Sequence, residues 1–160
     1  MVKLKLSIAA ELENVTNLEP VGNNFEFRFK VKCSSCNEEH PKTVSLNRAE
    51  EYEVSGSKNA KANFVWRCGL CRRESSAKFE STPITPYKAE NAQFGPLLVI
   101  ECRGLEFIGF DPEGTWKCVG TESGTVFSEV ELAEGEWSDY DEKASLPVNI
   151  SKIDSKWERA

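Results

Sequence analysis

Two Cys-x-x-Cys pairs are the residues of this chain best suited to chemistry. Cys33 and Cys36 form the first pair, and Cys68 and Cys71 form the second. Two intervening residues let one tight turn direct both sulfurs of a pair at a single point, and zinc prefers four such ligands in a tetrahedron. The spacing therefore predicts one zinc ion per chain, bound by these four cysteines.

A zinc site built from four thiolates is typical of a structural role. Catalytic zinc keeps one position open for water or substrate, whereas four thiolate charges make the metal a poor Lewis acid. The 31 residues between Cys36 and Cys68 exceed the roughly 15 to 20 of a compact zinc ribbon. Because loop length adds closure entropy only slowly, we expect two knuckle turns that neighbouring strands bring together.

The remaining histidine and cysteines are interpreted as residues without a catalytic or metal-binding role. His40 lies four residues after Cys36 and is a conceivable extra ligand, but a surface histidine before Pro41 is the favoured interpretation. Cys102 and Cys118 lie in strand-like segments, where a cysteine is usually buried and unreactive. Because the chain has one histidine and no Gly-rich phosphate loop, we expect no enzymatic activity.

Alternating apolar residues predict the strands that must position the cysteines. Residues 2–12 are apolar at every even position, and residues 25–33 alternate in the same way and end at Cys33. Shorter apolar segments with recurring glycines follow in residues 97–130. The sequence predicts a mainly β, single-domain, antiparallel β-sandwich or barrel-like fold across residues 1–160, with two zinc-knuckle turns.

Two segments are expected to lie outside the sheets. Residues 50–62 are polar and predict an exposed loop. Residues 139–160 are the one place where we expect a short helix, because Glu142, Lys143 and Ala144 favour helices. Pro147 would end that helix soon after it begins.

The composition argues against several classes of partner. No apolar run is long enough to cross a bilayer or to serve as a signal peptide, so we expect no membrane partner and a cytoplasmic location, with a nuclear one left open. The net charge is −6; residues 1–80 carry 13 Lys and Arg against 11 Asp and Glu, and residues 81–160 carry 7 against 15. An acidic protein repels phosphate backbones, so we expect no nucleic-acid partner.

Several blocks of the chain resemble the eukaryotic CXXC-motif-containing zinc-binding protein family. The blocks are residues 12–18 with 20–22, 32–36, 68–74, 86–90, 101–106, 122–125 and 139–143. The resemblance implies a single, mainly β domain with one zinc on Cys33, Cys36, Cys68 and Cys71, and it implies no established enzymatic activity. The polar blocks at 101–106 and 122–125 are expected to form either a partner surface or tight turns.

Three functions are compatible with these observations. The leading hypothesis is a non-enzymatic, monomeric, structural zinc-binding protein that serves as an interaction module for another protein. The alternative is a thiol-based redox or metal-handling protein that releases zinc on oxidation. Nucleic-acid binding through Arg72, Arg73 and Lys78 is the third, and the acidic second half of the chain opposes it.

Overall fold

The computed structural model describes residues 2–55, 60–81, 83–88 and 93–160. Within these ranges the chain forms β-strands connected by turns and loops, without a helix. The first half of the chain supplies β1 (Val2–Glu13), β2 (Val15–Pro20), β3 (Phe27–Cys33), β4 (Val44–Leu46), β5 (Tyr52–Glu53), β6 (Lys61–Ala62), β7 (Phe64–Arg67) and β8 (Glu74–Phe79). The second half supplies β9 (Gly95–Arg103), β10 (Leu105–Asp111), β11 (Thr115–Gly120), β12 (Val126–Glu131), β13 (Trp137–Asp141) and β14 (Leu146–Arg159).

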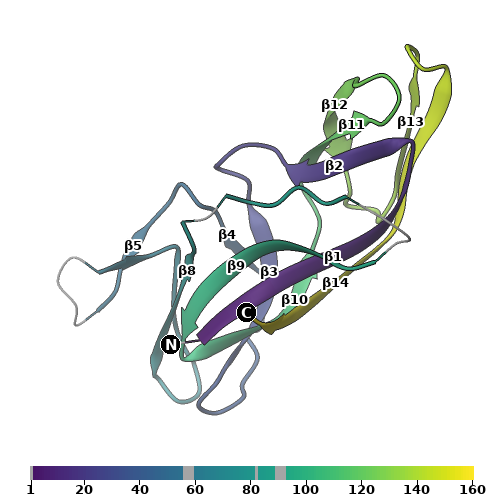
Figure 1. The fold of residues 1–160 in the computed structure, drawn as a ribbon. Helices are drawn as coiled ribbons and strands as arrows, with labels where there is room; N and C mark the ends of the chain where they lie inside the picture. The colour runs from purple at the N-terminus through teal and green to yellow at the C-terminus, as the bar shows by residue number, and fades with distance from the viewer. Residues whose placement is uncertain (1, 56–59, 82, 89–92) are drawn as a thin grey trace.

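These strands form one large antiparallel sheet and three smaller sheets. The large sheet has the order β13-β14-β1-β9-β8-β7, and the smaller ones have the orders β10-β3-β4, β12-β11-β2 and β5-β6. Figure 1 shows β1, β9 and β14 running side by side along the length of the molecule. The prediction of a single antiparallel, mainly β domain is confirmed. No helix in the described ranges is long and apolar enough to span a bilayer.

The central strand β1 confirms the alternation read from the sequence and adds to it. Leu6, Ile8 and Ala10 are buried, as the even positions predict. Ser7 and Ala9 are buried as well, so the middle of β1 is covered on both faces. The register of β1 against β14 shifts between Ala9 and Glu11, which marks a bulge in the strand.

Aromatic side chains join β3 to the large sheet. Phe27 and Phe29 on β3 are buried, as the alternating pattern predicted. The ring of Trp157 on β14 lies 5.1 Å from the ring of Phe29 and 4.8 Å from that of Phe107 on β10. Offset and edge-to-face contacts at these separations stabilise a core beyond the area that they bury. The small β10-β3-β4 sheet is therefore packed firmly against the large one.

The expected C-terminal helix is wrong, because residues 137–159 form the hairpin of β13 and β14. The helix-favouring residues 142–144 lie in the connecting turn, and Pro147 lies opposite Tyr140 in the ladder. From Asn149 onward β14 pairs with β1, so its backbone groups are satisfied by the sheet. Burial of Val148 and Ile150 on alternate residues also favours a strand.

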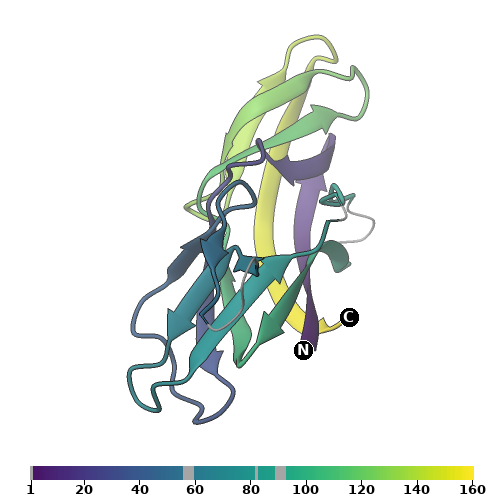
Figure 2. The same ribbon diagram turned by 90° about the vertical axis from the view of Figure 1, so that its left-hand side faces the viewer.

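The loop expected at residues 50–62 is confirmed in part. Its described residues are mostly exposed, but they include the short strands β5 and β6. Residues 56–59 of the loop, and residues 89 and 90 of the block at 86–90, lie outside the described residues. Figure 2 shows the molecule as elongated, with the β11–β12 and β13–β14 hairpins at one end and the two cysteine turns at the other.

Candidate metal centre

The first cysteine turn follows directly from β3. Cys33 is the last residue of that strand, and Asn37 N donates a hydrogen bond of 2.8 Å to the Cys33 carbonyl oxygen. The Cys33 N–H in turn donates to Glu38 O at 2.9 Å. Asn37 has a φ of 62°, a left-handed conformation that asparagine tolerates better than most residues. These bonds fold the chain back on itself, so that Cys33 and Cys36 project from one side of the turn.

The second turn has the same backbone geometry as the first. Between β7 and β8, Arg72 N donates to Cys68 O at 3.0 Å, and Cys68 N donates to Arg73 O at 3.0 Å. Arg72 has a φ of 64° and occupies the position that Asn37 occupies in the first turn. Cys68 and Cys71 therefore project from one side of their turn, as Cys33 and Cys36 do. Both turns are the knuckles that the sequence predicted.

The two turns bring all four sulfurs together. The four Sγ atoms lie within 4.8 Å of one another. Sγ of Cys33 lies 3.6 Å from Sγ of Cys71, and Sγ of Cys36 lies 3.6 Å from Sγ of Cys68. A tetrahedron of sulfurs around zinc at 2.3 Å has edges of about 3.8 Å. The separations therefore fit a single zinc ion, and the soft thiolate donor set is one that zinc prefers.

The turn between β9 and β10 holds the two knuckles in place. The carbonyl oxygen of Gly104 accepts a hydrogen bond from Ser34 N at 3.0 Å and another from Ser75 Oγ at 2.9 Å. Ser34 belongs to the first knuckle, and Ser75 follows the second on β8. Gly104 has a φ of +76°, and a Cβ atom there would lie 3.0 Å from Ser75 Oγ. The site thus depends on a glycine at this position.

Comparisons with known proteins agree with this geometry. Residues 5–158 match the family described as CXXC motif containing zinc binding protein, eukaryotic. The chain belongs to this family. The CXXC motif containing zinc binding protein of Homo sapiens is 41% identical over 154 residues, and that of Bos taurus is 42% identical; both matches cover 96% of each chain. The family description and the cluster of four cysteines together indicate one zinc ion per chain.

Two solved structures share the fold of this CXXC family member. The crystal structure of C1orf123 has a TM-score of 0.92 and 39% sequence identity, and the match covers 99% of each chain. A hypothetical protein from Plasmodium falciparum has a TM-score of 0.87 at 24% identity, with coverage of 99% of this chain and 100% of the other. The second likeness shows the fold alone.

The backbone around Cys33 favours a thiolate. Cys33 is fully buried, and this burial raises the pKa of its thiol. The amides of Cys36 and Ser35 hydrogen-bond to the sulfur and act in the opposite direction. Together with the Cys71 and Cys36 thiols, they lower the pKa to about 7. Amides that donate to a metal-binding sulfur orient it and tune its affinity. The first knuckle is therefore prepared to hold a negatively charged sulfur.

The second knuckle repeats this arrangement at its first cysteine. The amides of Cys71 and Leu70 lower the pKa of Cys68. Cys36 behaves differently: the Glu38 amide lowers its pKa, but burial and the neighbouring thiols outweigh that effect and raise it to about 12. Four thiolates packed this closely repel one another unless a cation lies between them. A divalent metal ion would remove that repulsion.

The other residues considered from the sequence lie outside the cluster. Nδ1 of His40 accepts a hydrogen bond from Lys42 N at 3.0 Å, and the His40 ring lies 5.2 Å from the ring of Trp66. Cys102 and Cys118 are buried, and burial raises the pKa of their thiols to about 11 and about 12. This agrees with the interpretation that both cysteines are unreactive.

Sequence reasoning missed the residues that fix the knuckles. Gly104 and Ser75 were not singled out, although Gly104 lies within the block at 101–106. The structure shows that this block contains the tight turn between β9 and β10, and the block at 122–125 the turn between β11 and β12. The sequence does contain a glycine within a polar block. Its hydrogen-bond partner, the Ser34 backbone amide, lies some seventy residues away, so the sequence alone does not indicate the contact.

Proposed function

We propose that this protein is a zinc-stabilised, non-enzymatic module that binds another protein. One observation carries the proposal: four cysteine sulfurs lie within 4.8 Å of one another. They can supply all four ligands of a tetrahedral zinc, whereas catalytic zinc keeps one position for water or substrate. Cys33 is the last residue of β3 in a small sheet, whereas Cys68 directly follows β7 of the large sheet. A metal ion bound to both would cross-link the two sheets, which is a structural role.

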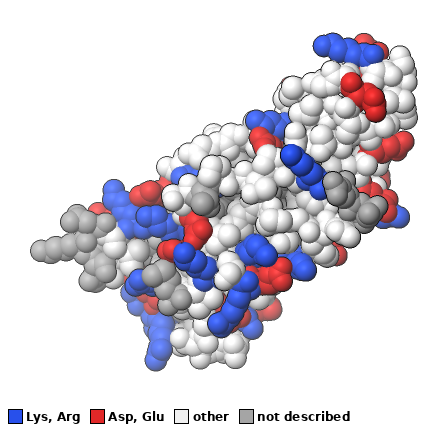
Figure 3. Space-filling model, viewed as in Figure 1, with Lys and Arg blue, Asp and Glu red and all other residues white. Residues whose placement is uncertain are grey.

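The surface beside the second knuckle supports a protein partner. The Leu70 side chain, at the tip of this knuckle, is 65% exposed. Arg73 donates to Ser35 Oγ at 3.4 Å across the two knuckles, and Arg72 is exposed next to it. Figure 3 shows basic side chains gathered over this end of the molecule with carboxylates among them. An exposed leucine beside arginines suits a partner that offers an apolar and acidic surface.

The mixed charge also underlies the proposal of no nucleic-acid or membrane partner. Arg67 lies 3.9 Å from Glu74, so the charge beside the knuckle is partly neutralised. Surfaces that bind phosphate backbones present a continuous basic stripe. We further propose that the protein is a cytoplasmic monomer that is not excluded from the nucleus.

The structural role is tested by spectroscopy of the bound metal. X-ray absorption at the zinc edge should show four sulfurs at about 2.3 Å and no oxygen or nitrogen. Equilibrium unfolding in the presence and absence of a strong chelator should then show that the metal stabilises the fold. A fourth ligand from water, or a fold equally stable without zinc, would contradict the structural role. Loss of partner binding in Leu70→Ser, with zinc content unchanged, tests the interaction surface.

A redox role is the second candidate, because sulfurs from different knuckles lie only 3.6 Å apart. Oxidation of Cys33 and Cys71 would form one S–S bond as two thiolates lose two electrons to hydrogen peroxide. The peroxide would take up two protons and leave as two waters, while the zinc dissociates. Stoichiometric zinc release by mild peroxide, reversed by a thiol reductant, would support this role. Retention of zinc until the protein aggregates would exclude it.

A further inference from the structure

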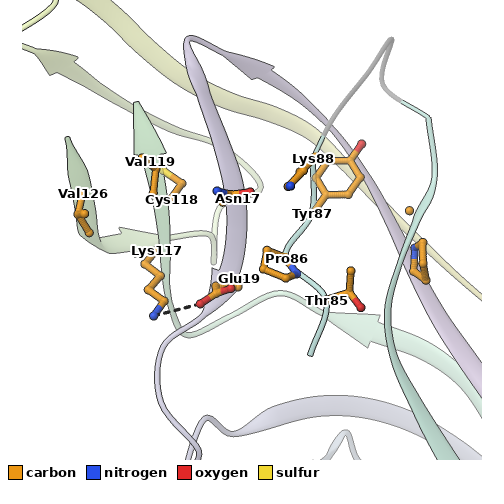
Figure 4. Close-up of a pocket in the computed structure, with 12 residues that line it drawn as sticks. Asn17, Glu19, Thr85, Pro86, Tyr87, Lys88, Lys117, Cys118, Val119 and Val126 are labelled. Carbon is orange, nitrogen blue, oxygen red and sulfur yellow. Dashed lines mark ion pairs between the residues drawn. The ribbon is translucent and has the colours of Figure 1, made fainter. Parts of the chain in front are cut away.

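A cavity of about 700 Å³ lies far from the knuckles, between the β12-β11-β2 sheet and the start of β9. Figure 4 shows the side chains around it, with Val119 and Val126 on one side and Pro86 and Tyr87 on the other. The volume lies within the range of roughly 300 to 1,000 Å³ that small-molecule sites occupy. The walls are mostly apolar, and a few polar groups converge on them.

The floor of the cavity is rigid. The Tyr87 backbone makes two hydrogen bonds with Leu18 on β2, of 3.0 and 2.8 Å. The Tyr87 hydroxyl accepts from Ala10 N at 3.1 Å and donates to Gln93 O at 2.7 Å. A Cβ atom on Gly95 would lie 3.2 Å from the Tyr87 ring, so the glycine allows close packing there. The cavity is thus already formed in the protein.

A bulge in β2 places an amide in the wall of the cavity. The register of β2 against β11 shifts between Lys117 and Val119, and Asn17 lies in the shifted segment with a φ of 54°. Asn17 Oδ1 is buried and has no hydrogen-bond partner within the part of the chain that the structure describes. An unpaired buried acceptor is unfavourable, and each such group requires an explanation. A donor on a bound ligand would provide the missing partner, since the amide can rotate about its broad χ2 torsion.

The charged groups at the rim favour an anion. Lys117 pairs with Glu19 at 3.0 Å. Lys88 has no ion pair among the described residues, and Figure 4 shows its amine on the side to which the Asn17 oxygen is directed. Lys88 therefore supplies one positive charge at the rim of the cavity that no described carboxylate neutralises. The Lys88 amine could donate a charge-assisted hydrogen bond to a ligand carboxylate.

We propose that this cavity binds a small organic acid with a flat apolar body and an N–H group. The body lies between the proline and valine walls, the carboxylate pairs with Lys88, and the N–H donates to Asn17 Oδ1. This site is independent of the zinc centre, which lies at the other end of the molecule (Figure 2). It assigns a ligand-binding role to the residues that line the cavity.

The test is a titration of the zinc-loaded protein with indole-3-acetate, followed by NMR amide shifts. We expect saturable shifts at Asn17, Val119 and Val126, with a dissociation constant of roughly 1 mM for a ligand of this size. Indole-3-acetamide lacks the charge, and benzofuran-3-acetate lacks the N–H. Each should bind at least roughly tenfold more weakly. Equal affinity for all three compounds, shifts elsewhere in the protein, or no saturation would overturn the proposal.

Variants separate the charge at the rim from the shape of the cavity, while the benzofuran-3-acetate comparison tests the N–H contact. Lys88→Gln should weaken indole-3-acetate without changing the affinity for indole-3-acetamide. Asn17→Asp tolerates the same left-handed backbone and should weaken indole-3-acetate by repelling its carboxylate. Lys42→Gln, a change near the knuckles, is the matched control and should bind like the wild type. A melting temperature equal to that of the wild type confirms folding, and unchanged affinity in both cavity variants would refute the assignment.

Discussion

The sulfurs of Cys33 and Cys71 lie 3.6 Å apart, although 38 positions separate the two residues in the sequence. Cys36 and Cys68 lie equally close, so each knuckle meets the other through both of its cysteines. Each knuckle supplies only two of the four sulfurs of the cluster. The zinc therefore couples the end of β3 to the β7–β8 hairpin, and the loss of one cysteine is expected to loosen both.

The first prediction concerns single cysteine variants. Cys33→Ser and Cys71→Ser should each lose zinc affinity and stability to a similar extent, because each removes one ligand from the shared site. Loss of a group that only orients a ligand lowers affinity 10- to 100-fold, so loss of a ligand should destabilise the zinc-loaded protein by more than about 2.7 kcal/mol. Chemical denaturation with zinc present measures this.

Ser34→Ala is the matched control for these variants. Ser34 is exposed in the first knuckle, and its hydrogen bond to Gly104 uses the backbone amide. The free energy of unfolding of the Ser34→Ala variant should stay within about 0.5 kcal/mol of the wild-type value. If Ser34→Ala lost as much stability as Cys33→Ser, the damage would come from the turn and not from the metal.

The second prediction concerns the glycine between the knuckles. Gly104→Ala should lower both stability and zinc affinity, because φ is +76° and the new Cβ would approach Ser75 Oγ to 3.0 Å. The strain should amount to about 1 to 3 kcal/mol. Gly124→Ala is the control, since Gly124 has a φ of +72° with no atom within 4 Å of a new Cβ. Isothermal titration with zinc should show weaker binding for the first variant alone.

The third prediction concerns acid stability. Asp141 is buried and accepts hydrogen bonds from Ser123 Oγ, from Ala144 N at 3.2 Å and from Thr125 Oγ1 at 3.2 Å. The Ser123 hydrogen bond is the main cause of its lowered pKa; burial opposes it, and the Ala144 amide adds to it. Because the folded pKa lies below the unfolded value of about 3.9, the stabilisation is present above that pH and is lost as the pH falls through the folded pKa.

Asp141→Asn tests this carboxylate directly. The variant should melt several degrees lower at neutral pH, and the difference from the wild type should shrink below about pH 4. Thermal melts from pH 2 to 7 measure the effect. The zinc site lies at the opposite end of the molecule, so zinc content at pH 7 should be unchanged. A constant difference between the two proteins across this range would show that the charge of Asp141 has no role.

The fourth prediction concerns the two remaining cysteines. Cys102 and Cys118 are buried with raised pKa values, so iodoacetamide should not modify them in the folded protein at pH 7.5. All six cysteines should react after unfolding with a chelator present. Mass spectrometry counts the adducts. Rapid modification of either residue in the folded protein would contradict the packing described for it.

The sequence was sufficient for features that depend on local pattern. Alternation predicted β1 and β3, and the spacing of the cysteines predicted both knuckles. The strand β14 was missed because Glu142 to Ala144 favour a helix locally, whereas pairing with β1 across the sheet decides the outcome. Such pairing is a tertiary effect that overrides propensity.

Long-range hydrogen bonds could not be predicted from the sequence either. Gly104 lies 29 residues from Ser75, and its carbonyl serves two elements at once. The blocks at 122–125 and 139–143 were seen separately, yet Ser123 and Thr125 from the first bind Asp141 from the second. The sequence motifs contain the residues that form these hydrogen bonds, but only the fold shows which residues contact one another.

Metal content is the most direct test of the central claim. The protein should be purified without added metal, and its zinc should be counted together with its native mass. The four-cysteine site predicts one zinc per monomeric chain in the wild type and none retained in either Cys33→Ser or Cys68→Ser. Wild-type protein that carries no metal, with its knuckle cysteines joined as disulfides, would contradict the account and place the redox role first.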